Sequence, residues 1–242
     1  MKSNRLLFVF IFMLLGALLL DSCRSMPRVG ELQSESQSIE LGDAKSVLVK
    51  INMGAGNLVV AGGTEQLLDA DFNYNVARLK PEVNYADDTL VLGQPDAEGL
   101  PDLRGITDFR NDWNLQLNND VPMDLRVNMG AGTSELHLAD LALTGLAITL
   151  GAGQSTVDLN GNWTRDLDVT VDTGATDITV QLPQNVGVRV EVERGPTAID
   201  ASGLTQDGDI YTNAAYGESP VTLDVNVKAG VGLLNLEVVD DQ

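Results

Sequence analysis

The stretch Leu125-Arg126-Val127-Asn128-Met129-Gly130-Ala131-Gly132 contains the pattern that decides the fold of this 242-residue chain. Apolar side chains alternate with polar ones until the run reaches a Gly-Ala-Gly triplet. The same pattern recurs at residues 47–56 and 146–153, with degenerate copies at 173–176, 194–197 and 228–232. Alternation with a period of two predicts β-strands, because successive side chains of a strand point to opposite faces. No convincing amphipathic helix follows residue 22, so the pattern predicts an all-β protein.

The spacing of the triplets indicates how the strands are arranged. Gly130 and Gly151 are 21 residues apart, Gly151 and Gly174 are 23 apart, and Gly174 and Gly195 are 21 apart. A near-constant repeat of short strands and corners is typical of a β-solenoid, in which each coil stacks on the next. The sequence therefore favours a β-solenoid with coils of 21–23 residues. A β-sandwich remains the alternative, because regularly spaced short strands also suit that fold.

The glycines are interpreted as structural corners rather than as a ligand loop. Glycine accepts positive φ angles and lets neighbouring backbones approach closely. A phosphate-binding loop would lead into a helix, whereas these triplets lead into another strand. The predicted corner residues are Gly54, Gly56, Gly130, Gly132, Gly151, Gly153, Gly174, Gly195 and Gly230.

The N-terminus has the features of a secretory signal. Lys2 and Arg5 precede an apolar run over residues 6–20, which is shorter than the roughly 20 residues of a bilayer-spanning helix. Leu20-Asp21-Ser22-Cys23 resembles a bacterial lipobox, although Asp21 replaces the usual small residue. We expect residues 1–22 to be a lipoprotein signal peptide and Cys23 to carry the lipid, which places the mature chain outside the cytoplasm on the bacterial cell membrane. An uncleaved anchor and an ordinary cleaved signal are the alternatives.

The remaining chain divides into three predicted parts. Residues 23–45 are polar and are expected to form a flexible tether. Residues 46–122 form a β-rich part with a long insertion over 64–122, and residues 123–240 form the regular repeats. Within the insertion we expect strands at 69–76, 82–85, 89–92 and 114–117. The insertion is either a distinct subdomain or a modified end of the stack. A second break in the period falls at residues 202–220.

Composition excludes several kinds of function. A formal net charge of −20 argues against nucleic acid as a partner. The single histidine, His137, has outward parity and no local partner for a catalytic triad, so we predict no catalytic residue. One histidine and one cysteine make a zinc site improbable, and no metal site or cofactor is predicted. Asp207-Gly208-Asp209 and Asp240-Asp241 leave calcium binding open, but neither has EF-hand spacing.

Three segments carry a resemblance to a known family. Residues 114–125 with 129–132, residues 208–211 with 215–225, and residues 67–76 with 79–83 resemble the bacterial toast-rack family, and the resemblance extends over roughly residues 46–240. The chain is more distantly similar to the C-terminal domain of LiaF-type envelope-stress regulators and to bacterial adhesin-like proteins. The resemblance implies a β-rich surface domain and supplies no functional residues.

The sequence thus favours a binding or adhesin-like module without catalysis. We expect a membrane contact through the lipid and a partner that is either another envelope protein or a polysaccharide. A LiaF-like accessory role in envelope-stress signalling is the second hypothesis, and a glycan-active enzyme is the third. Trp113, Tyr211 and Tyr216 are the candidate surface aromatics, with packing at coil ends as their alternative role.

Overall fold

The fold was obtained from a computed structural model, which describes residues 29–94 and 108–240. Its regular elements are almost all strands, and they lie in one long, open sheet of mixed direction. In chain order the elements are β1 (Gln33–Ile39), β2 (Val47–Thr64), β3 (Leu68–Tyr74), the 3-10 helix η1 (Ala77–Leu79), β4 (Glu82–Ala86), β5 (Thr89–Gly93), β6 (Asn111–Asn118), β7 (Met123–His137), β8 (Leu143–Asp158), β9 (Leu167–Pro183), β10 (Gly187–Arg194), β11 (Thr197–Ser202), β12 (Thr205–Asp207), β13 (Ile210–Thr212), β14 (Thr222–Ala229) and β15 (Gly232–Val239).

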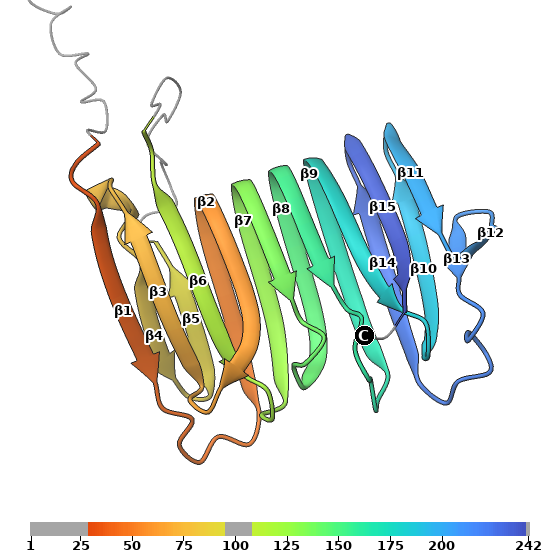
Figure 1. The fold of residues 1–242 in the computed structure, drawn as a ribbon, viewed down its shortest axis with the longest axis horizontal. Coiled ribbons are helices and arrows are strands. Elements are labelled where there is room, and N and C mark those ends of the chain that lie inside the picture. The colour runs from red at the N-terminus through yellow and green to blue at the C-terminus, as the bar shows by residue number, and fades with distance from the viewer. Residues whose placement is uncertain (1–28, 95–107, 241–242) are drawn as a thin grey trace, which may run out of the picture.

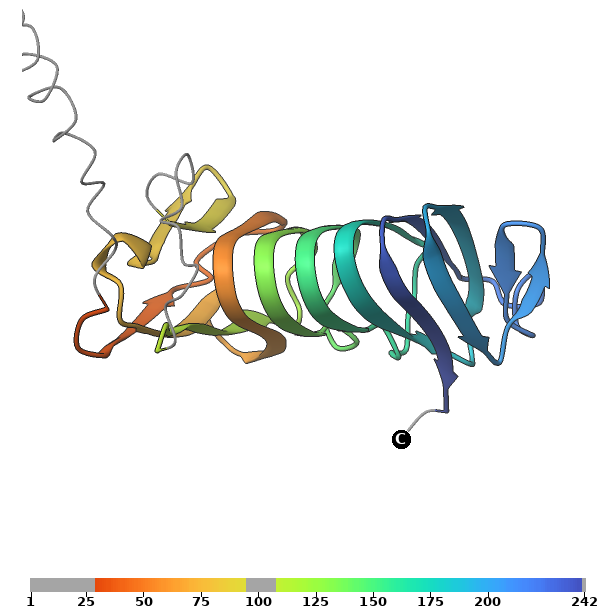
Figure 2. The same cartoon turned by 90° about the horizontal axis from the view of Figure 1, so that it is seen from above.

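Four long strands, β2, β7, β8 and β9, bend in the middle and run through two layers (Figure 1). The strands are parallel to one another and in register on both sides of the bend, so that Ile51 faces Val127 before it and Leu58 faces Ser134 after it. We call the layer before the bend the first face and the layer after it the second face. Figure 2 shows the bent strands stacked side by side along the molecule. This arrangement fits the expected solenoid.

The core fills the space between the two layers. Alternate side chains point inward, and Val49, Ile51 and Val127 on the first face are completely buried, as are Val60 and Leu136 on the second. Burying one such side chain contributes about 1.5–3 kcal/mol. β-Branched residues suit these positions because they pack well on a pleated surface. The period-two pattern of the sequence is therefore the pattern of core contacts.

The stacking order differs from the order of the chain. The sequence predicted that the coil ending near Gly195 follows the coil at Gly174, but β14 and β15 lie between them. β14 pairs in parallel with β9 on one side and with β10 on the other, and β15 likewise lies between β9 and β11. The last strands of the chain are thus inserted into the stack rather than added to its end.

Residues 64–122 form the N-terminal end of the stack. β6 pairs in parallel with the second-face half of β2, and β5 pairs in parallel with its first-face half. Because both join the same sheet, the insertion is a modified end of the stack. The predicted tether over residues 23–45 extends too far toward the C-terminus. Part of it forms β1, which pairs antiparallel with β3 along its whole length. The alternation of apolar and polar residues did not predict β1, because the inward positions of this strand include Glu35 and Gln37 instead of apolar residues.

The C-terminal end of the first face is closed by β13 and β12, which pair next to β10. Asn213 fixes the following loop, and its side chain is 7% exposed. Its Nδ2 donates hydrogen bonds to the carbonyl groups of Pro183 (3.1 Å) and Val186 (2.8 Å), while its Oδ1 accepts one from the Val188 amide (3.0 Å). The buried side-chain amide of Asn213 therefore hydrogen-bonds to three backbone groups of the β9–β10 connection and holds that connection at the C-terminal end of the first face.

Candidate functional site

The glycine corners form a ridge along one edge of the stack. A Cβ placed on Gly151 would lie 2.2 Å from the carbonyl oxygen of Gly130, and one on Gly174 would lie 2.3 Å from that of Gly151. A Cβ on Gly230 would lie 2.1 Å from the carbonyl oxygen of Gly174, and one on Gly195 would lie 2.7 Å from that of Gly230. The structure therefore places these glycines where successive backbones come too close for a side chain.

The second glycine of each triplet has an additional constraint. Gly56, Gly132 and Gly153 have φ angles of 142°, 128° and 136°, which residues with a side chain rarely adopt. A Cβ on Gly132 would also lie 1.9 Å from the carbonyl oxygen of Gly56. The middle residues of the three Gly-Ala-Gly triplets are alanines, such as Ala131 and Ala152, so this part of the ridge has no polar side chain at those positions.

Two of the three candidate surface aromatics are buried, which corrects the sequence-based expectation. Trp113 is 1% exposed and packs edge-on against Phe72, with ring centroids 5.4 Å apart, while its Nε1 donates to Asn111. Tyr211 is 3% exposed on β13. Tyr216 is 42% exposed. Trp113 lies on β6, near the opposite end of the stack from Tyr211, so the aromatics do not form a common binding surface (Figure 1).

Two further predicted positions bear on the site. Cys23 lies outside the described residues. His137 lies on the outer side of the second face, is about half exposed, and has its Nε2 3.8 Å from a carboxylate oxygen of Glu135.

An extensive polar surface covers the outer side of the second face. The residues that point outward there come from β1, β3, β6, β2, β7, β8, β9, β15 and β11. At about 4.8 Å for each strand, this face is about 40 Å long. Its carboxylates are Asp69, Asp71, Asp112, Glu135, Asp158, Asp177, Asp200 and Glu237. Hydroxyl and amide side chains, including Thr133, Gln154, Thr156 and Thr179, occupy most of the other positions.

Positive charge is lacking on this second face. None of its outward positions holds lysine or arginine. Arg110, which precedes β6, lies nearby, and its Nη1 is 3.5 Å from Asp112 Oδ2. The first face differs, because its acidic residues alternate with cations. Arg126 pairs with Asp124 at 3.1 Å, and Arg189 contacts both Glu191 and Asp224. The two faces therefore have different electrostatic character, and the second attracts positive charge.

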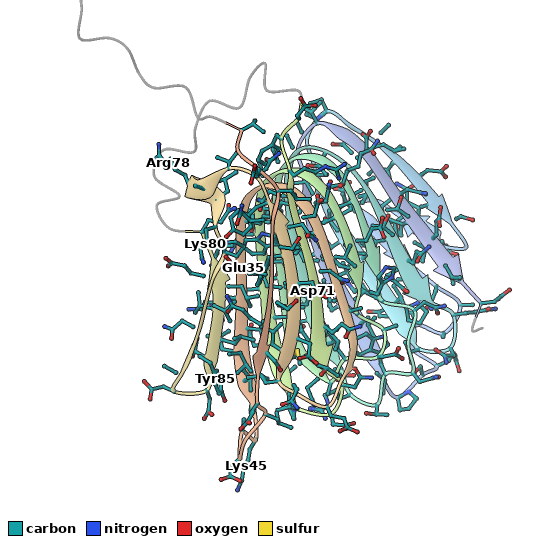
Figure 3. All side chains as sticks on the ribbon, turned by 60° about the vertical axis from the view of Figure 1, so that its left-hand side comes forward. Glu35, Lys45, Asp71, Arg78, Lys80 and Tyr85 are labelled. Carbon is teal, nitrogen blue, oxygen red and sulfur yellow. The ribbon has the colours of Figure 1, made fainter. Side chains whose placement is uncertain are left out.

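Polar side chains on the second face contact one another from strand to strand. Asn57 Nδ2 donates to Asp112 at 2.6 Å, and Thr133 Oγ1 donates to Asn57 Oδ1 at 2.5 Å. Asp71 accepts a hydrogen bond from Ser36. Figure 3 shows Asp71 on the outer side of β3, at the N-terminal end of this face. These contacts order the side chains in rows that cross the strands.

A separate cluster fixes the N-terminal end. Lys80 Nζ and the Tyr74 hydroxyl donate to Glu35 Oε1 at 2.9 Å and 2.6 Å, and Glu35 and Lys80 lie close together in Figure 3. The hydrogen bonds from Lys80 and Tyr74 lower the pKa of Glu35. The hydrogen bond to Glu35 raises the pKa of Lys80. The cluster joins β1 to β3 and the residue after η1, so its role is structural.

A cleft of about 640 Å³ lies at the edge opposite the glycine ridge. Asp140, Asp158, Asn160 and Arg165 contribute to its polar lining. Trp163 also lines it but is 8% exposed, and its Nε1 donates to the Leu159 carbonyl at 2.8 Å. The cleft can offer hydrogen bonds to a polar molecule, but the indole has little surface for stacking.

Residues 29–94 and 108–240 contain no group of three or more His, Cys, Asp or Glu side chains that could hold a metal ion. In the same ranges, no helix has the length and apolar character needed to cross a bilayer.

Corner-stacked strands with a broad, polar outer face define this chain as an all-β protein of the toast-rack type. Residues 28–181 match the family described as the N-terminal domain of toast_rack, DUF2154, and the chain belongs to this family. The three segments that carried the resemblance in the sequence lie within the bent strands and at the two ends of the stack.

Comparison with solved structures agrees with this assignment. The chain is similar to a crystal structure named "putative cell adhesion protein" from Clostridium sporogenes, with 30% identity and a TM-score of 0.82. The match covers 86% of this chain and all of the other. A "putative adhesin" from Bacteroides fragilis, at 11% identity and a TM-score of 0.27 over 86% of this chain and 98% of the other, is too distant to support an inference. No curated protein matches the chain.

Proposed function

We propose that this protein is a lipid-anchored, extracytoplasmic β-solenoid that binds a partner through its second face and performs no catalysis. The observation that carries the proposal is the contrast between the faces. The second face presents carboxylates such as Glu135, Asp177 and Asp200 over about 40 Å without an outward lysine or arginine. Complementary charge steers association and selects partners.

The partner that fits this face is a protein surface rich in lysine and arginine. Carboxylates accept charge-assisted hydrogen bonds from both side chains, and the neighbouring hydroxyl and amide groups add neutral hydrogen bonds. Another envelope protein with a basic surface would meet these requirements. The name of the Clostridium sporogenes relative, a "putative cell adhesion protein", supports an adhesin-like role in the same direction.

The signal features of the N-terminus support the anchored location. If Cys23 carries the lipid, the variant Cys23→Ala should be recovered in the soluble fraction, whereas the parent chain remains with the membrane. Metabolic labelling with a palmitate analogue provides the direct measurement. Unchanged membrane retention and unchanged labelling of the variant would contradict the anchor.

A matched pair of variants tests the face. The second-face variant carries Glu135→Gln, Asp177→Asn and Asp200→Asn, and the first-face control carries Asp168→Asn, Asp172→Asn and Glu193→Gln. Both remove the same number and kind of carboxylates, so their net charges are equal. Binding of a fluorescent deca-lysine peptide is measured by anisotropy at about 50 mM salt, where surface charges are weakly screened.

We expect the second-face variant to bind the peptide at least fivefold more weakly than the first-face control. Equal losses in both variants would show that the peptide responds to total charge and would contradict a dedicated face. Binding of uncharged oligosaccharides in place of the peptide, with the same dependence on the second face, would assign the face to a polysaccharide and overturn the basic partner.

A further inference from the structure

The C-terminal end of the second face has an unpaired strand edge. β11 pairs in parallel with β15 along Thr197–Ser202, and no described strand pairs with its other side. An edge of this kind presents backbone donors and acceptors in the geometry of a sheet, and proteins usually protect it.

Protection is visible at two other edges of the stack. At the N-terminal end of the second face, β1 directs Glu35 and Gln37 inward, and Glu35 is held by Tyr74 and Lys80. Inward-pointing polar and charged groups oppose the addition of another strand. At the C-terminal end of the first face, β12 is only three residues long, and all three are exposed. Neither device occurs on β11.

The inward side of β11 is incompletely covered. Ile199 and Ala201 are half-buried, whereas Leu234 and Leu236, their partners on β15, are completely buried. The first face continues past β10 with β13 and β12, but the second face stops at β11 (Figure 1). One added strand beside β11 would therefore cover the exposed parts of Ile199 and Ala201.

The outward side of β11 indicates which charge the added strand should carry. Asp200 is exposed, its partner on β15 is Asn235, and Glu237 lies opposite Ser202. The outward positions of these two strands contain no lysine or arginine. A basic side chain on the added strand would therefore lie beside carboxylates and would meet no repelling charge. Pairs of opposite charge on neighbouring strands stabilise a sheet.

A second copy of the chain fits this edge poorly. Antiparallel pairing of two β11 strands would keep both first faces on one side of the assembly. The β10 edges would then be separated by about one strand spacing, about 4.8 Å. The β13 and β12 strands of both copies would have to occupy that gap. A single extended segment beside β11 meets no such obstacle.

We propose that the free edge of β11 binds an extended segment of a partner polypeptide as an additional strand, with apolar side chains over Ile199 and Ala201 and a basic side chain near Asp200. Main-chain hydrogen bonds supply affinity in this mode of recognition, and alternate side chains supply specificity. β11 and Asp200 also belong to the second face, but the inference rests on the unpaired backbone edge of β11 and would stand even if the rest of the second face bound no partner.

The test uses the full-length chain in detergent and the probe acetyl-KVKVKVK-amide, which alternates basic and apolar residues. Hydrogen exchange measured by mass spectrometry should slow at least fivefold over residues 197–202 when the peptide is present. A peptide of the same sequence with alternate N-methylated residues cannot complete the ladder and serves as the control of equal charge. Protection elsewhere, or equal protection by both peptides, would overturn the proposal.

A pair of charge reversals supplies a second readout. Asp200→Lys should weaken peptide binding at least fivefold, whereas Asp207→Lys on exposed β12 changes the same charge at the same end and should weaken it less than twofold. Equal effects would contradict pairing at β11. If the chain forms a dimer by light scattering and residues 197–202 are protected without peptide, the edge belongs to a second copy and the proposal is wrong.

Discussion

Gly153→Ala tests the physical basis of the corner stack. A Cβ on Gly153 would lie 1.8 Å from the carbonyl oxygen of Gly132 and 2.9 Å from its carbonyl carbon. The residue also has a φ of 136°. Backbone conformations reserved for glycine cost another residue about 1–3 kcal/mol, and overpacking against a fixed neighbour costs about 1–3 kcal/mol. The two costs add, so we expect Gly153→Ala to lower the free energy of unfolding by about 2–6 kcal/mol.

Two further variants separate the contributions. Gly208 has a φ of 63°, but nothing lies within 4 Å of its added Cβ, so Gly208→Ala measures only the backbone cost, about 1–2 kcal/mol. Gly151 does not have a positive φ, and its Cβ would lie 2.2 Å from the Gly130 carbonyl oxygen. Gly151→Ala should therefore measure only the close approach, about 1–3 kcal/mol.

The assay is equilibrium unfolding in guanidinium chloride, followed by the fluorescence of Trp113 and Trp163. The parent chain and the three variants are compared by midpoint and slope, because an unchanged slope shows that the difference is one of stability. A loss below about 1 kcal/mol in Gly153→Ala, or a loss equal to that of Gly208→Ala, would refute the argument that the corners require glycine because of stacked carbonyl groups.

Two other predictions concern the ends of the stack. Asn213→Ala removes three hydrogen bonds to buried backbone groups and should lower the free energy of unfolding by about 2–4 kcal/mol, whereas Asn226→Ala on an exposed position should change it by less than about 0.5 kcal/mol; equal losses by denaturant titration would contradict the capping role. The lowered pKa of Glu35 stabilises the fold above the carboxyl's unfolded-state pKa, and this contribution is lost as the pH falls through the folded-state value. Denaturant midpoints should therefore fall less between pH 7 and pH 3 in Glu35→Gln than in the parent chain, and identical falls would show that the interaction contributes nothing.

The alternation predicted the strands of the stack because each inward position must be apolar. Val169 and Val171 on β9, for example, are completely buried where the parity placed them. β1 was missed because its inward Glu35 and Gln37 break that pattern at an edge. The order of stacking was not predictable from spacing, because the repeats share one register and β14 can pair equally well with β9 or β10. Only the contacts reveal that β14 lies between them.

The surface was harder to predict than the core. Trp113 and Tyr211 were predicted to be surface aromatics, but both are buried and complete the core near the two ends of the stack. The charge contrast between the faces is present in the sequence, since parity separates outward residues and each corner separates the faces. Arg126 precedes its corner and Glu135 follows it. The missing information was that the segments after successive corners, and the strands of the insertion, form one continuous face.

The most direct test of the second face is carboxylate footprinting of the unmodified chain with deca-lysine bound. Carbodiimide labelling with glycine ethyl ester, read by mass spectrometry, reports the accessibility of each carboxylate. The account predicts that the peptide protects Glu135, Asp177 and Asp200 and leaves Asp168 and Glu193 labelled as before. Equal protection on both faces, or stronger protection on the first face, would contradict the claim that the second face is the binding surface.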